Sequence, residues 1–192
     1  DLAQVGTPAP RELPPLAESM AHLAEGWARL EGDGAAVDAA VAAVGEHGPW
    51  LRERLGELVD LARAGVDASV GETLVHGDFR ADNVMLATAP DPRVWLIDWP
   101  HAARDGARWW DLLATLPSVA MQEGGDPEQH FWSHPNAAGA DRDAVRAVLA
   151  GLTGFFVQAA VQPAPHGIPN LRAFQLAQGM AAAHAAGARV TT

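Results

Sequence analysis

Three oxygen-bearing side chains stand at a spacing that suits phosphoryl transfer. The stretch LVHGDFRADNVML contains Asp78 and, five residues later, Asn83, and the stretch VWLIDW contains Asp98. In such chemistry a loop aspartate accepts the proton of the attacking hydroxyl, while an asparagine and a second aspartate hold magnesium. Magnesium prefers hard oxygen ligands, and nucleotide phosphates supply part of its shell, so two protein oxygens suffice. We therefore expect Asp78 to be the base, and Asn83 and Asp98 to be the metal ligands.

Other residues of the same stretch have roles that the spacing does not assign. We expect the ring of His76 to brace the loop through a hydrogen bond rather than to take part in the chemistry. Arg80 and Asp82 are candidates either for contacting a substrate or for solvating the loop, and the sequence favours neither role. A lone aspartate or asparagine in a turn is usually a turn or capping residue. The interpretation therefore depends on the joint pattern.

Short strands are expected to position these residues. Apolar or β-branched runs separated by turn residues predict strands at 73–76, 84–86 and 94–97. Residues 77–83 form a polar loop between the first two strands, and Ala-Pro-Asp-Pro at 89–92 is typical of a turn between the last two. The pattern places the three oxygen-bearing residues on neighbouring strand ends. Of the seven tryptophans, Trp95 is expected in the core.

Helices are expected on both sides of the strands. Apolar residues at helical spacing, with capping residues and prolines at first positions, predict helices at 16–30, 35–44, 49–61, 109–116, from 127, from 141, and at 171–186. The proline-rich segment 6–15 is expected to be an extended connector, and 163–169 separates the last two helices. The predicted fold class is α+β, mostly helical, with a few short strands around the polar loop.

Composition bounds the kind of protein. The 192 residues, 48% of them hydrophobic, are enough for one sizeable core, so residues 1–192 are expected to form a single domain. The formal charge of -11 argues against nucleic acid and suits cationic or metal-bound partners. No apolar run approaches roughly 18 residues, so no membrane association is expected. The absence of cysteine excludes disulfides and thiolate metal sites, and a cytoplasmic location is expected.

The basic residues are all of one type. All 13 are arginine, and the chain contains no lysine. A Walker-type phosphate loop and a Schiff-base enzyme both need a lysine, and an intact kinase needs the strand-borne lysine that holds the nucleotide phosphates. These three arrangements are therefore excluded for this chain on its own.

The pattern HGDxxxxN followed by IDW resembles the aminoglycoside phosphotransferase and choline kinase-like family, which has a protein kinase-like fold. The catalytic loop of that family is matched by His76, Gly77, Asp78 and Asn83. Asp98 matches its second metal-binding aspartate, and Asp111 in WWDLL matches an aspartate that supports the loop. The resemblance implies an enzyme that uses Mg²⁺ and ATP to phosphorylate a hydroxyl of a small molecule. The acceptor would be aminoglycoside-like or another amino or alcohol compound, and a cationic acceptor is compatible with it. Its specific part spans residues 73–113.

Parts of that family's pattern have no counterpart in this sequence. A glycine-rich loop, a phosphate-binding lysine and a preceding five-stranded lobe are missing from it. We therefore expect a carboxy-terminal lobe with an incomplete ATP site, which folds but does not catalyse without the nucleotide-binding lobe. The face that the other lobe would cover is expected to be apolar and to favour self-association.

Two other classes of function stay open. His76, Asp78 and Asp98 have the chemistry of zinc or manganese ligands in a hydrolase, although that interpretation leaves Asn83 unexplained. The chain also suits a non-catalytic module that binds a partner or a small cation. Magnesium-dependent nucleotide binding would separate the phosphotransferase from such a module. Acidic positions that suit a polyamine or aminosugar, or that simply form a charged surface, are Asp105, Glu123, Asp126 and Glu128.

Overall fold

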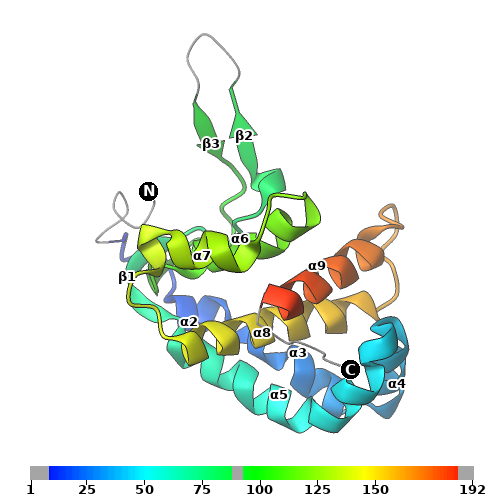
Figure 1. Ribbon diagram of the computed structural model, residues 1–192. Helices are drawn as coiled ribbons and strands as arrows, with labels where there is room; N and C mark the ends of the chain where they lie inside the picture. The colour runs from blue at the N-terminus through cyan, green and yellow to red at the C-terminus, as the bar shows by residue number, and fades with distance from the viewer. Residues whose placement is uncertain (1–8, 88–92, 186–192) are drawn as a thin grey trace. The chain divides into compact units, whose positions relative to one another are not determined.

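The computed structural model describes residues 9–87 and 93–185, and it is α+β and mostly helical, as predicted (Figure 1). The α-helices are α2 (Leu16–Ser19), α3 (Ala21–Glu31), α4 (Gly34–Ala43), α5 (Gly48–Ala68), α6 (Trp110–Met121), α7 (Pro127–Ser133), α8 (Arg142–Ala160) and α9 (Leu171–Ala185). The 3-10 helices are η1 (Gly45–His47), η2 (Ala81–Asn83) and η3 (Pro135–Ala137). The strands are β1 (Val70–Val75), β2 (Val84–Leu86), β3 (Val94–Leu96) and β4 (Ala103–Gly106).

The backbone divides into two compact units. The strand unit comprises the described residues up to Ser19 together with Ser69–Gly139, and it contains all four named strands with α2, α6 and α7. The helical unit comprises Met20–Ala68 and the described residues from Ala140 onward, and it contains α3, α4, α5, α8 and α9. Every candidate site residue named above belongs to the strand unit.

The helical unit is held by close helix packing and apolar burial. Helix α3 approaches α8 so closely that a Cβ added to Gly26 would lie 2.3 Å from the carbonyl carbon of Gly154. The indole Nε1 of Trp27 donates to the carbonyl of Ala150 at 2.8 Å. These contacts lie beside a core of buried side chains made up of Trp27, Leu30, Ala40, Val44, Leu51, Leu55, Val59, Ala62 and Val157.

Helix α8 is apolar along most of its length. It has 19 residues and a mean hydropathy of 1.2, which is long and apolar enough to cross a membrane by length and composition. Of that window 61% is buried within the structure. A core helix passes the same test, and the burial of α8 against its helical neighbours accounts for its composition.

Two separate antiparallel pairs make up the sheet structure of the strand unit. Strand β1 pairs with β4 in an irregular register, because Val70 and Thr73 both lie opposite Gly106. Strands β2 and β3 form a regular two-stranded hairpin, with Met85 opposite Trp95 (Figure 1). The site lies along the chain between β1 and α6, so both pairs supply backbone that frames it.

Several predicted helices are confirmed, with small shifts at their ends. Helix α7 begins at Pro127, and the carboxylate of Asp126 accepts hydrogen bonds from two backbone N–H groups of its first turn. Helix α8 begins after Asp141, whose carboxylate accepts a hydrogen bond from the backbone N–H of Ala144. Local capping chemistry therefore determines where these helices start.

One predicted helix is wrong in its extent. Residues 16–30 form not one helix but α2 and α3, which are separated at Met20. The apolar residues of the two parts pack into different cores: Leu16 is fully buried in the strand unit, whereas Trp27 is buried in the helical unit. The break at Met20 coincides with the boundary between the two units, so tertiary packing overrides the continuous apolar pattern.

Two further strand-level predictions also need correction. Strand β4 was not expected, because its sequence Ala-Arg-Asp-Gly lacks β-branched residues. Trp95 is not in the core, since 55% of it is exposed. The reason is that β2 and β3 form a sheet of only two strands, so one or both faces stay open. The predicted turn at 89–92 lies outside the described residues.

Candidate functional site

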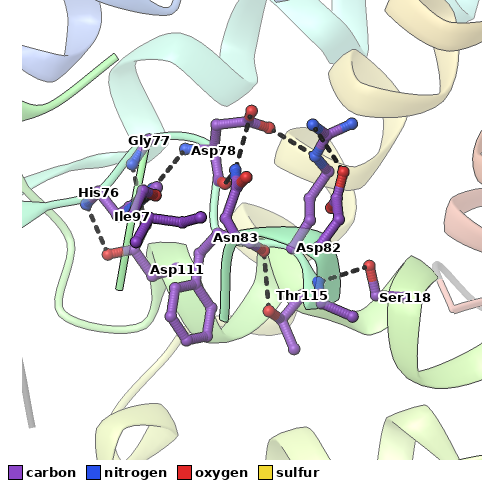
Figure 2. A network of polar contacts seen from close by, with 12 residues as sticks. His76, Gly77, Asp78, Asp82, Asn83, Ile97, Asp111, Thr115 and Ser118 are labelled. Carbon is purple, nitrogen blue, oxygen red and sulfur yellow. Dashed lines mark hydrogen bonds and ion pairs between the residues drawn. The ribbon is translucent and has the colours of Figure 1, made fainter. Parts of the chain in front are cut away.

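The carboxylate of Asp111 holds the start of the polar loop. Its Oδ2 accepts a hydrogen bond from the backbone N–H of His76 at 2.8 Å, and its Oδ1 accepts one from Gly77 at 3.1 Å (Figure 2). Asp111 lies in the first turn of α6, where a negative charge is favourable. Two successive backbone donors are thereby satisfied by one side chain, which ties the loop to α6.

Gly77 is required at its position for two reasons. Its φ is +81°, a conformation that other L-residues rarely adopt. A Cβ at this position would also lie 2.2 Å from the carbonyl oxygen of His101. The glycine between His76 and Asp78 is therefore a consequence of backbone geometry and crowding, and not of any chemistry of its own.

His76 is fully buried and uses both ring nitrogens. Its Nε2 lies 2.9 Å from the carbonyl oxygen of Ile97, and its Nδ1 lies 3.4 Å from the backbone nitrogen of Asp78. A carbonyl oxygen only accepts and a backbone N–H only donates, so Nε2 carries the proton and Nδ1 accepts. The ring thus bridges the loop and the segment after β3. The indole of Trp99 packs beside it, with ring centroids 4.5 Å apart.

Asn83 closes the other end of the loop onto Asp78. It is 5% exposed, and its Nδ2 donates to the carbonyl of Asp78 at 2.8 Å and to the Oδ2 of Asp78 at 3.3 Å. The carbonyl acceptor identifies which end of the amide is nitrogen. The amide oxygen therefore points away from this contact, and it is the end of Asn83 that can bind a cation.

The carboxylate of Asp78 is shared between two partners. Its Oδ2 receives the amide of Asn83, and its Oδ1 lies 3.0 Å from the Nε of Arg80. A terminal nitrogen of Arg80 lies 3.3 Å from the Oδ2 of Asp82. The side chain of Asp78 is 29% exposed, so it remains accessible to a small reactant while these contacts orient it.

Asp98 is brought beside the loop by its neighbour Ile97. The backbone N–H of Ile97 donates to the carbonyl of Asn83 at 3.1 Å, and its carbonyl receives the proton of the His76 ring. Asp98 itself is exposed and has a φ of 61°. A left-handed conformation is uncommon outside glycine, although aspartate tolerates it better than most residues. The backbone conformation at Asp98 therefore follows two hydrogen bonds that fix the N–H and the carbonyl of Ile97.

Two hydroxyl residues of α6 support the loop and were not anticipated. Thr115 donates from Oγ1 to the carbonyl of Phe79 at 2.8 Å, and Ser118 Oγ accepts from the backbone N–H of Ala81 at 3.3 Å (Figure 2). Together with Asp111 they lie on one face of α6, at positions i, i+4 and i+7. This polar stripe in an otherwise apolar helix is the signal that sequence analysis missed.

Burial sets the electrostatic state of Asp111. Removal of its carboxyl from water raises its pKa, and the hydrogen bonds from the backbone of His76 and Gly77 offset that rise only in part. The residue that holds the loop is thus more readily protonated than an ordinary aspartate. The stabilising contribution of Asp111 therefore depends on pH.

The described part of the chain was searched for side chains that could bind a metal ion together. Within 9–87 and 93–185 there is no group of three or more His, Cys, Asp or Glu side chains that could hold a metal ion. Both ring nitrogens of His76 are already hydrogen-bonded, so this histidine does not support a hydrolytic zinc or manganese site.

Comparison with protein-family models, curated proteins and solved structures finds no match to this chain. The interpretation of the site therefore depends on the hydrogen bonds, burial and backbone conformation of these residues.

Proposed function

We propose that this chain carries the catalytic loop of a phosphotransferase that phosphorylates a hydroxyl of a small molecule, within a kinase-like carboxy-terminal lobe. The observation that carries the proposal is the connection of Asp78, Asn83 and Ile97, the residue before Asp98, through direct hydrogen bonds. The candidate base and the two candidate magnesium ligands therefore lie on two chain segments that a hydrogen bond joins. This is the combination that phosphoryl transfer needs, because its catalysis consists largely of positioning and charge stabilisation.

In the proposed reaction, Asp78 accepts the proton of the acceptor hydroxyl. The hydroxyl oxygen forms a bond to the γ-phosphorus of ATP as the bond from that phosphorus to the bridging oxygen breaks. The electron pair of the broken bond leaves with ADP, and the proton on Asp78 later passes to solvent. The contacts from Asn83 and Arg80 orient the Asp78 carboxylate for this step.

The amide oxygen of Asn83 and the carboxylate of Asp98 would hold Mg²⁺, which neutralises charge on the phosphates when it is bound. The donor set fits the ion, because both donors are hard oxygens and the Asn83 nitrogen is engaged elsewhere. We expect ATP to need further contacts to its phosphates, since this chain has no lysine. A net charge of -11 favours an acceptor that carries positive charge, such as an amino alcohol.

Binding of Mn²⁺ to this chain tests the metal site directly. Mn²⁺ is a paramagnetic substitute for Mg²⁺, and it should broaden the backbone amide resonances near Asn83 and Ile97. Asp98→Asn should weaken binding roughly tenfold, since a charged ligand contributes more than a neutral one. Asn83→Ala should weaken it less.

Asp105→Asn is the matched control. Asp105 has a φ of 57°, close to that of Asp98, but it forms an ion pair with Arg104 and lies in β4. Its substitution should leave Mn²⁺ binding unchanged. Equal losses in the Asp98 and Asp105 variants, or an Asn83 variant more damaging than the Asp98 variant, would show that the ligand roles are wrong.

A further inference from the structure

The candidate site presents a charge problem that the proposed function does not resolve. Asp78, Asp82, Asp98 and Asp111 all lie on or beside the loop, and a nucleotide triphosphate is itself strongly negative. Arg80 is the only lysine or arginine in the sequence between Arg63 and Arg93. Bound magnesium would offset part of this charge, but a second cation at the loop would lower the repulsion further.

Arg80 is held in place without using its full hydrogen-bonding capacity. Its side chain is 24% exposed and lies near two carboxylates, with the Nε 3.0 Å from Asp78 and a terminal nitrogen 3.3 Å from Asp82. The Nε is buried, yet it makes no hydrogen bond of acceptable direction with the described part of the chain. The contact with Asp78 is thus an attraction between charges and not a forked pair.

The chemistry of the guanidinium points to the missing partner. Its planar donors match two oxygens of a phosphate or a carboxylate, and a forked arrangement is stronger than a single misdirected contact. Neither Asp78 nor Asp82 provides that arrangement, because each is approached by a different nitrogen at one oxygen. A phosphoryl group at the loop would provide it, and would also satisfy the buried Nε.

We propose that Arg80 is the phosphate-binding residue of this loop, and that it exchanges Asp78 for oxygens of the phosphoryl group when the donor binds. The exchange has two consequences: the anion gains a forked partner, and the Oδ1 of Asp78 is released to accept the proton of the acceptor hydroxyl. Asp82 remains the counter-ion that holds Arg80 before binding. This inference rests on the proposed function, since it names the cation that would bind the phosphates at the proposed site.

Inorganic pyrophosphate with Mg²⁺ is the probe, and the 192-residue chain is the sample. Its binding can be followed through the Nε–H resonance of Arg80 in a ¹H–¹⁵N spectrum, which should shift on saturation. Arg80→Gln should lower the affinity about tenfold, as expected for the loss of a charge-assisted hydrogen bond. Arg80→Lys should recover part of that loss, because it restores the charge but not the fork.

Asp82→Asn should change the affinity for pyrophosphate in the opposite direction. It therefore tests the inference even if the Arg80 variants do not fold. Removal of the competing carboxylate 3.3 Å from Arg80 should raise the affinity for pyrophosphate a few-fold. Arg108→Gln is the matched control, since Arg108 also lies in the strand unit but contacts Asn136, and it should change nothing.

Three results would overturn the inference: no binding of pyrophosphate by the unsubstituted chain, unchanged affinity in Arg80→Gln, or reduced affinity in Asp82→Asn. Mn²⁺ binding without the anion separates this failure from that of the proposed function. If Mn²⁺ still binds through Asp98 while Arg80→Gln has no effect, only the role of Arg80 is lost. If Mn²⁺ does not bind, the proposed metal site itself is wrong.

Discussion

The polar loop of the strand unit and the helix packing of the helical unit are stabilised by different physical means. In the loop, side chains of α6 hydrogen-bond to backbone groups of residues 76–81, and much of the segment stays accessible. In the helical unit, α3 and α8 meet at Gly26 and Gly154 with almost no room for a side chain. Substitutions in the loop that remove the proposed chemistry should therefore leave the fold intact, whereas the helix contact should accept neither a larger nor a charged side chain.

The largest effect is expected at Asp78 and follows from the proposed phosphotransferase function, assayed with a nucleotide-binding lobe present. Asp78→Asn should lower turnover roughly 10²- to 10⁴-fold, the usual contribution of a general base, because the amide cannot accept the proton. Nucleotide affinity should change little. Steady-state kinetics with saturating acceptor and magnesium provide the measurement, with thermal unfolding as the check that the fold is intact. Near-normal turnover would remove Asp78 from the role.

A purely structural loss is expected at the helix contact. Gly26→Ala places a Cβ 2.3 Å from the backbone of Gly154, so α3 and α8 must separate. Overpacking of this kind costs about 3 kcal/mol of unfolding free energy. Denaturant titration measures it.

Gly34 provides the matched control for that variant. It begins α4 and has no atom within 4 Å of an added Cβ, so Gly34→Ala should be neutral or gain about 0.5 kcal/mol. Similar losses in both variants would mean that the close approach of α3 and α8 does not explain the loss at Gly26.

An intermediate effect is expected at Asp111. Asp111→Ala leaves the backbone N–H groups of His76 and Gly77 without their acceptor, which should cost about 2 kcal/mol of stability. Amide hydrogen exchange should show the local consequence, with faster exchange at those two residues and little change in the helical unit. Unchanged exchange at both amides would contradict the bracing role.

The same residue gives the loop a defined pH dependence. Burial raises the pKa of Asp111 in the folded state above its value of about 4 in the unfolded chain. Its stabilising contribution is therefore complete below about pH 4, and it falls as the pH rises through the folded-state pKa. The difference in unfolding free energy between the natural chain and Asp111→Ala should shrink over that rise. A difference that grows with pH would reverse the sign and show that the two amide hydrogen bonds outweigh burial.

The predictable parts of the fold are those determined locally. The starts of α7 and α8 follow from an aspartate that caps the first turn, and the sequence around Asp126 and Asp141 carries that signal. The break at Met20 could not be predicted, because the residues before it pack in the strand unit and those after it pack in the helical unit. Strand β4 was missed for a similar reason, since pairing with β1 and not intrinsic propensity makes Ala-Arg-Asp-Gly extended.

The candidate site divides in the same way. The spacing of Asp78, Asn83 and Asp98 is visible in the sequence, because each residue type has a chemical reason to be where it is. The contacts of Thr115 and Ser118 are not visible from local patterns, since they depend on where α6 lies relative to the loop. The pairing of Arg80 with Asp78 likewise depends on the conformation of the folded loop.

The smallest change in the free energy of unfolding is expected at Trp95. This residue lies in the β2–β3 hairpin, outside both the braced loop and the packed helices. Trp95 is 55% exposed and pairs with Met85, which is also 55% exposed, so little apolar area returns to water when it is replaced. Trp95→Ser should change the free energy of unfolding by no more than about 0.5 kcal/mol. Trp27→Ala is the contrast, because Trp27 is 2% exposed and donates to Ala150, and its loss should cost about 4 kcal/mol. Denaturant titration of the two variants under the same conditions measures both, and a loss at Trp95 that approached the loss at Trp27 would mean that a partner surface covers the hairpin in solution.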